Sequence, residues 1–169
     1  MLIMALLLQA AAPPAEIELD ESDLHQMSMI AGSRQVAAIE QMKVLKPDQL
    51  ALALNDALSD RTRTIYYDGQ GVLVEYTAPG GELRLWYPGK RRAVAGQWGV
   101  QQKKKLVNAC FRYRAPTGPV PQPFEPRECV QPERTLGESN VIREWRGDVF
   151  NLMTGQVPYV KSVMGLPTP

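Results

Sequence analysis

The sequence has a single histidine, His25, and only two cysteines, and these shortages exclude several kinds of site. A Ser-His-Asp triad would have one possible base, and no G-x-S-x-G segment is present to carry its nucleophile. A structural zinc site needs about four ligands, which two cysteines and a distant histidine do not provide. The H-E-x-x-H motif and the glycine-rich nucleotide-binding loops are also missing. The sequence therefore predicts no catalytic residue, no metal and no cofactor.

The chain also lacks a surplus of charge of either sign. Its 19 Lys and Arg residues and 18 Asp and Glu residues leave a formal net charge of +1. A nucleic-acid-binding domain normally has a strong basic surplus, so DNA or RNA is not an expected partner. Apolar residues make up 44% of the 169 residues, enough for one domain with a hydrophobic core.

Uninterrupted apolar segments are short, and the most pronounced one lies at the start. Residues 2–8 are all apolar and are followed by small and then acidic residues. This order is typical of a secretory signal peptide and is too short for a membrane-spanning helix. We expect residues 1–15 to be a signal peptide and the protein to be periplasmic or secreted, not integral to a membrane. A buried N-terminal helix is the alternative.

Cys110 and Cys129 are the only cysteines. In an exported chain an even pair favours one disulfide, so we expect these two residues to be bridged. Two free thiols in a cytosolic protein are the alternative.

Residues 16–60 have helical character. The apolar residues of segment 33–45 recur every three or four positions, with Ser33 as a candidate N-cap. In the next segment Pro47 suits the first position of a helix. The apolar side chains of that helix form one stripe, which we expect to pack on a sheet: Leu50, Leu54, Ala57 and Leu58.

From residue 61 onward, apolar and polar residues alternate in short runs separated by turn residues such as Gly80-Gly81. This pattern predicts four or five strands of an antiparallel meander within 61–169, with short strands in 139–153 and an irregular tail from 157. The expected fold class is α+β: N-terminal helices packed on a partly open, barrel-like antiparallel sheet, with one disulfide. Residues 16–60 and 61–169 are expected to form one structural domain.

The pair Gly96-x-Trp98 lies on about the fourth expected strand. Lipocalins, which enclose small apolar ligands, have Gly-x-Trp on their first strand. Because the pair comes late here, we expect Trp98 to fill the core rather than to line a cup, and Gly96 to leave room for a ring or a strand bend. Tyr76 and Phe111 are the other expected core residues. An enclosed ligand cup is the alternative.

Residues 115–127 contain five prolines, which cannot supply ladder hydrogen bonds, and are expected to form a stiff extended loop. We expect this loop to recognise a partner, with Phe124 as the anchor among Pro121, Pro123 and Glu125. The alternative is that Phe124 folds back over a sheet edge. Lys103-Lys104-Lys105 marks a solvated turn, with contact to an anionic surface as the alternative.

The middle of the chain, residues 47–129, resembles a family of small secreted bacterial domains of unknown function. The residues that carry the resemblance are Asp60-Arg61-Thr62, Glu75-Tyr76, Gly81, Gly96-x-Trp98 and Cys110-Phe111. The resemblance implies a compact β-meander in a periplasmic or extracellular setting, and it transfers no catalytic residue. The long Pro-rich loop and the C-terminal extension depart from it.

These features together predict an exported, non-enzymatic binding module of the bacterial envelope, whose partner is a periplasmic or extracellular protein. Inhibition of a hydrolase is one such role. One alternative is a carrier of small apolar ligands with a partly open barrel. Another is a glycan-acting enzyme with a carboxylate pair, for which Glu75 and Glu82 are candidates.

Overall fold

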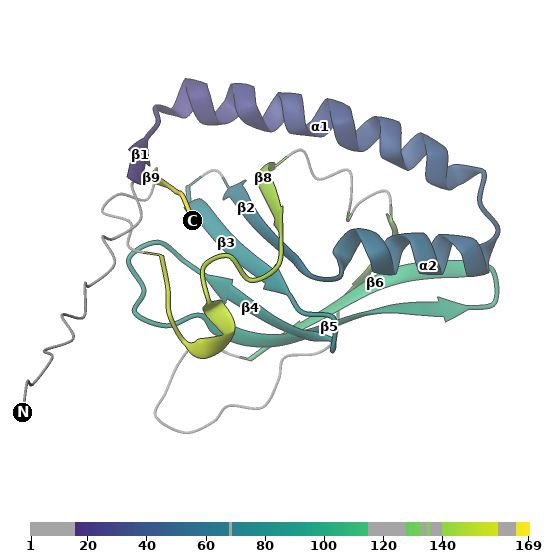
Figure 1. Cartoon of the computed structure of the whole chain (residues 1–169). Coiled ribbons are helices and arrows are strands. Elements are labelled where there is room, and N and C mark those ends of the chain that lie inside the picture. The colour runs from purple at the N-terminus through teal and green to yellow at the C-terminus, as the bar shows by residue number, and fades with distance from the viewer. Residues whose placement is uncertain (1–15, 68, 115–127, 133–134, 136–139, 159–164) are drawn as a thin grey trace, which may run out of the picture.

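The structure is a computed structural model and describes residues 16–67, 69–114, 128–132, 135, 140–158 and 165–169 (Figure 1). Two α-helices precede the main sheet: α1 (Glu21–Lys43) and α2 (Pro47–Leu58). Seven strands form the main sheet: β2 (Arg61–Tyr67), β3 (Gly71–Thr77), β4 (Glu82–Trp86), β5 (Val94–Lys103), β6 (Leu106–Tyr113), β7 (Glu128–Val130) and β8 (Val141–Arg146). A 3₁₀ turn, η1 (Leu152–Thr154), follows, and a second sheet pairs β1 (Glu16–Glu18) with β9 (Gly165–Pro167).

Helix α1 begins earlier than the sequence pattern predicts. The Asp20 carboxylate accepts a hydrogen bond from the Asp23 amide at 2.8 Å, and the Asp23 carboxylate accepts one from the Asp20 amide at 3.4 Å. This reciprocal cap starts the helix at Glu21. Ser33 lies inside the helix, where its hydroxyl donates to the Ile30 carbonyl at 2.8 Å, so the expected N-cap at Ser33 is wrong.

Helix α2 follows the prediction closely. Pro47 occupies the first helical turn, where a missing backbone N–H costs nothing. Leu54 and Leu58 are fully buried against the sheet, and Leu50 packs beside them. Leu50, Leu54 and Leu58 of the predicted stripe therefore pack on the sheet, and Ala51 joins them there instead of Ala57.

The main sheet confirms the predicted α+β class with an antiparallel meander. Its strand order is β7-β6-β5-β4-β3-β2-β8, and every neighbouring pair is antiparallel. Strands β2 to β6 pair in chain order, while β8 adds to one edge and β7 to the other. The expectation of an irregular tail is wrong for Gly165–Pro167, which pairs with Glu16–Glu18. That pairing also makes residues 16–18 a strand, although residues 16–60 were expected to be helical.

The predicted disulfide between Cys110 and Cys129 is confirmed. The two residues face each other across β6 and β7, with their Cα atoms 4.0 Å apart. Cys110 is completely buried, whereas Cys129 is exposed on the edge strand. The bridge therefore fastens the short strand β7 to the sheet.

The sheet curls into a half-barrel. Val130 of β7 and Val141 of β8 belong to opposite edges of the sheet, yet both line one hollow on the same face. This face is called the inner face below, and it is the face on which α2 packs (Figure 1).

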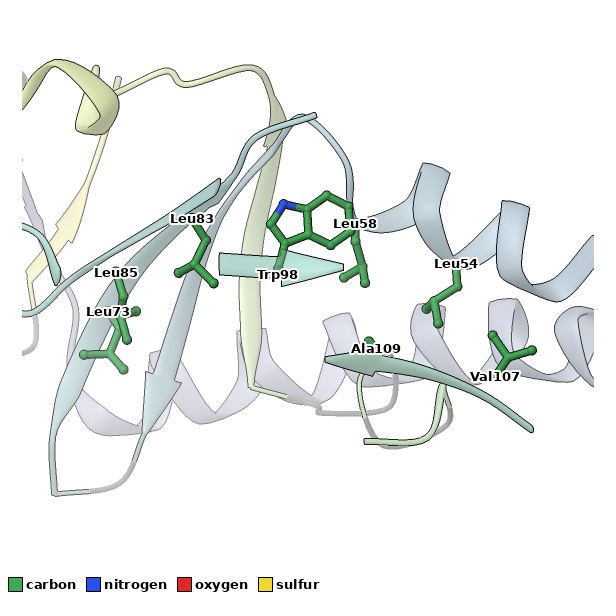
Figure 2. Close-up of a cluster of buried hydrophobic side chains, with 8 residues drawn as sticks. All are labelled: Leu54, Leu58, Leu73, Leu83, Leu85, Trp98, Val107 and Ala109. Atoms are coloured by element: carbon green, nitrogen blue, oxygen red, sulfur yellow. The ribbon is translucent and has the colours of Figure 1, made fainter. Parts of the chain in front are cut away.

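The inner-face core is built from two helical leucines and from alternate residues of four strands. Its members are Leu54, Leu58, Leu73, Leu83, Leu85, Trp98, Val107 and Ala109. Figure 2 shows the α2 leucines at the end that holds Trp98, Ala109 and Val107, with Leu73 and Leu85 at the opposite end. Helix α2 thus fills one end of the half-barrel.

The outer face is also covered, which explains why every residue of β3 is buried. Val74, Tyr76 and Trp86 pack against Phe150 and Leu152 of the C-terminal segment. Further along, the buried residues Leu24, Val72, Ile142 and Leu166 join α1, β3, β8 and β9. Among the described helices, none combines the length and apolar character that crossing a bilayer requires.

Candidate functional site

A cleft of about 400 Å³ lies on the inner face, at the end that shows Leu73 and Leu85 in Figure 2. Strands β2 to β6 all contribute to it, because alternate residues of each strand point to this face. Its lining residues are Ile65, Tyr67, Gln70, Leu73, Glu75, Leu85, Tyr87, Val94, Tyr113 and Arg114. The cleft is therefore an apolar hollow with a few polar groups, which is the usual composition of small-ligand sites.

A second hollow of about 230 Å³ adjoins the cleft. The two share Ile65, Tyr67, Glu75 and Tyr113. The second hollow extends toward the edge strands, with Glu128 and Val130 of β7 and Val141 of β8 in its lining. The shared residues make the two hollows one continuous depression along the inner face.

Glu75 is the buried acidic side chain of this depression. It is 7% exposed and lies in the middle of β3, between apolar neighbours. The Tyr113 hydroxyl, from β6, donates a hydrogen bond to Glu75 Oε2 at 3.0 Å. Because β4 and β5 lie between β3 and β6 in the sheet, this bond spans the concavity and joins two walls of the cleft.

Tyr113 is held in its neutral form. Burial raises the pKa of its phenol far above the ordinary value, and the adjacent Glu75 carboxylate raises it further. Tyr67 and Tyr87 raise the pKa of Tyr113 as well, and both line the same cleft. Three phenols and one carboxylate therefore gather on the inner face, beside the apolar floor.

Arg63 lies beside Glu75 on the neighbouring strand β2. It is the register partner of Glu75 across β2 and β3, and it is 7% exposed. Its Nε donates to Glu144 Oε2 at 2.8 Å, and one terminal nitrogen donates to the Ala57 carbonyl at 2.7 Å. Arg63 thereby ties the end of α2 to strand β8 and holds one wall of the depression in place.

Trp98, the expected core residue, lies outside the cleft. It is 5% exposed, and its indole N–H donates to the Ala78 carbonyl at 2.8 Å. A Cβ atom added at Gly96 would lie 2.8 Å from both Leu83 Cγ and the Arg112 carbonyl oxygen. Gly96 therefore makes room for Leu83 and the neighbouring backbone rather than for a ring, and Trp98 fills the core.

Of the remaining predicted residues, the structure describes Tyr76 and Phe111 but not those of the Pro-rich loop. Tyr76 is buried in the outer-face core, where its hydroxyl donates to Asp60 Oδ1 at 3.0 Å. Phe111 is half-buried, packs against the inner-face core and lines the smaller hollow. The predicted binding residues of the Pro-rich loop lie outside the described residues: Pro121, Pro123, Phe124 and Glu125.

Glu75 and Glu82 do not form a carboxylate pair. Glu75 and Leu85 are register partners, so Leu85 shares the inner face with Glu75. Glu82 precedes Leu85 by an odd number of residues on the same strand and therefore points to the opposite face. The two residues were suggested as a pair because both belong to one hairpin, but proximity along a hairpin does not show which face of the sheet each side chain occupies.

Comparison of the chain with protein-family models, curated proteins and solved structures gives no match. The resemblance to a family of small secreted domains therefore stays a prediction, and so does the absence of an enzymatic activity. Within the described part of the chain, no group of three or more His, Cys, Asp and Glu side chains is placed to hold a metal ion.

The sequence pattern did not single out Tyr67, Tyr87 and Tyr113 as one group. A signal for them was present: Tyr67 and Tyr113 alternate with residues of the opposite face on β2 and β6, and Tyr87 directly follows β4. The acidic residue in the middle of the apolar run GVLVEYT, Glu75, was the second signal. A charge inside a buried strand is uncommon unless it is paired or serves a site.

Proposed function

We propose that this protein is a non-enzymatic binding protein that holds one small amphipathic molecule in the inner-face cleft. The observation that carries the proposal is the composition of the cleft: an apolar floor of Ile65, Leu73 and Leu85 beside the hydrogen-bonded pair Glu75–Tyr113. A volume of about 400 Å³ falls within the usual range of small-molecule sites. The floor takes the apolar part of the ligand, and the polar pair takes its head.

The chemistry of the polar pair favours a ligand head that donates hydrogen bonds. A carboxylate has about four lone-pair sites on two oxygens, and it accepts hydrogen bonds without donating any. Tyr113 stays protonated and uses its proton toward Glu75. Beside this pair, an ammonium or amide head is complementary, whereas Glu75 would repel a carboxylate or phosphate head. Arg114 also lines the cleft and has the opposite preference, so the competition described below compares cationic with anionic heads.

An oxidising compartment is part of the proposal. The support is the Cys110–Cys129 bridge, because disulfides persist mainly in secreted and periplasmic proteins. Hydrolase inhibition through the loop at 115–127 stays a separate prediction, since that loop lies outside the described residues.

A titration with a fluorescent apolar amine, N-phenyl-1-naphthylamine, tests the proposal. Val94 lines the cleft and is only half-buried, so Val94→Phe narrows the hollow without opening a cavity in the core. Val36→Phe, on the exposed side of α1, is the matched control. We expect Val94→Phe to weaken binding about tenfold or more and Val36→Phe to leave it within about twofold.

The head-group chemistry is tested by competition. Dodecylamine should displace the probe at lower concentration than dodecyl sulfate does, and Glu75→Gln should reduce that difference. The proposal is wrong if the parent protein does not bind the probe. It is equally wrong if the Val94→Phe and Val36→Phe variants, matched in melting temperature, bind it alike.

A further inference from the structure

One end of the molecule combines lysines with exposed apolar side chains. It consists of the corner between α1 and α2 and the turn between β5 and β6, which lie at the same end in Figure 1. The Gln102 side-chain amide donates to Asp48 Oδ1 at 2.7 Å and connects the start of α2 to the end of β5. This end of the molecule is called the lysine tip below, and its lysines are Lys43, Lys46, Lys103, Lys104 and Lys105.

All five lysines of the tip are exposed. The acidic residues within the same segments are Glu40, which pairs with Lys43 at 2.6 Å, and Asp48, which accepts from Gln102. Five positive and two negative charges leave the tip at +3, whereas the whole chain has a net charge of +1. This end of the molecule therefore has a local positive surplus.

Two large apolar side chains stand among these lysines. Val44 is 83% exposed and lies between Lys43 and Lys46. Leu106 is 60% exposed, follows Lys105 directly and faces Lys103 across the hairpin. Exposed apolar side chains flanked by lysines are the composition of surfaces that bind anionic bilayers, where lysines contact the head groups and apolar side chains enter between them.

The turn between β5 and β6 places a lysine in a backbone conformation that lysine seldom adopts. Lys104 has φ of 58°, in the left-handed region that glycine or asparagine adopts more readily. A tight hairpin turn would ordinarily place glycine there. The lysine adds charge at the turn of the hairpin, at a cost in backbone energy.

We propose that the lysine tip docks the protein on an anionic lipid surface, with Val44 and Leu106 entering the head-group layer. The proposal does not depend on the inner-face cleft, because none of these residues lines it. The exposed valine and leucine favour a membrane over a soluble polyanion, which would use the lysines alone. Each lysine near an anionic surface contributes about a fivefold factor in partitioning.

Co-sedimentation with lipid vesicles tests this docking. The parent protein should bind vesicles containing about 30 mol% phosphatidylglycerol in phosphatidylcholine, and should not bind pure phosphatidylcholine. The triple variant Lys103→Gln/Lys104→Asn/Lys105→Gln should lower the partition coefficient about a hundredfold. Asparagine is chosen at position 104 because it tolerates the left-handed backbone.

The matched control removes three positive charges elsewhere. Lys90, Arg91 and Arg92 are exposed in the loop before β5. Strand β5 has ten residues and is about 30 Å long, and it separates this loop from the tip. Lys90→Gln/Arg91→Gln/Arg92→Gln has the same net charge as the tip variant. We expect it to change partitioning by less than about threefold, because screening limits the reach of distant charges.

The apolar contribution is measured separately, at about 0.5 M NaCl, where charge attraction is screened. Val44→Ser/Leu106→Ser should then weaken binding about tenfold. The control Val36→Ser, at an exposed valine earlier in α1, should not change binding. Equal losses in the two charge triples would overturn the proposal in favour of net charge alone. Unchanged binding of Val44→Ser/Leu106→Ser would overturn it in favour of a soluble polyanion.

Discussion

Replacing Trp98 by alanine removes the tryptophan that fills the α2 end of the inner-face core. The side chain is 5% exposed and packs beside Leu58, Leu83 and Ala109. Truncating a buried large aromatic side chain to alanine costs about 3–5 kcal/mol, which combines lost burial with the cavity left behind. The free energy of unfolding should therefore fall by about 4 kcal/mol, and the melting temperature by roughly 8–16 °C for a domain of this size.

Trp98→Phe separates the two contributions of the indole. Phenylalanine keeps most of the apolar contact but loses the hydrogen bond from the indole N–H to the Ala78 carbonyl, 2.8 Å away. That variant should cost about 1–2 kcal/mol, since one buried acceptor loses its donor. Val36→Ala, on the exposed side of α1, should stay within about 0.5 kcal/mol of the parent.

Urea unfolding followed by far-ultraviolet circular dichroism measures all three variants, and the slope against urea should stay constant. A loss below about 1 kcal/mol for Trp98→Ala would refute the reasoning, because it would place the ring in an open space. A loss for Trp98→Phe as large as that for Trp98→Ala would instead assign most of the energy to the hydrogen bond.

Two further predictions follow from the contacts of single residues. Gly96→Ala should destabilise the protein by about 1–3 kcal/mol, because the new methyl group would lie 2.8 Å from Leu83 Cγ. Gly80→Ala is the control and should be tolerated, because the space around its Cβ position is open. Thermal unfolding compares the two variants. Burial, and then the hydrogen bond to Asp60, raises the pKa of Tyr76 from 10.0 to about 12. The unfolded state therefore loses the Tyr76 phenol proton at a lower pH than the folded state does, so the free energy of unfolding should fall as pH rises from 10 to 12. The fall should be less steep in Tyr76→Phe, and urea titrations at a series of pH values measure it in both proteins.

The strands and the second helix could be predicted because their signals are local. Alternation within 61–113, turn glycines and Pro47 each act over a few residues, and the structure keeps all of them. The disulfide could be predicted from the presence of a single cysteine pair. The start of α1 was missed because Asp20 and Asp23 were grouped with the acidic residues that follow the leader, although their spacing also fits a reciprocal cap.

The candidate site could not be predicted from local patterns. Glu75 and Tyr113 meet only because the sheet curls, and the curl depends on the sum of many small strand twists. The alternation of β3 does not show which face turns inward, since both faces are buried. Whether α2 covers the whole inner face or one end depends on where Leu54 and Leu58 find partners, and sequence spacing does not contain that information.

The pairing of β1 with β9 has a consequence for the order in which the protein is built. Residues 16–18 are synthesised before α1 and the main sheet, but their strand partner, residues 165–167, is synthesised after every strand of that sheet. Until then the contacts that Leu166 makes with Leu24, Val72 and Ile142 cannot form, so α1 has no complete docking surface. A ribosome adds about 5–20 residues per second, so the first helix waits several seconds for the last strand. The nascent chain therefore leaves α1 without this partner, and accessible to chaperones, until residues 165–167 have been made.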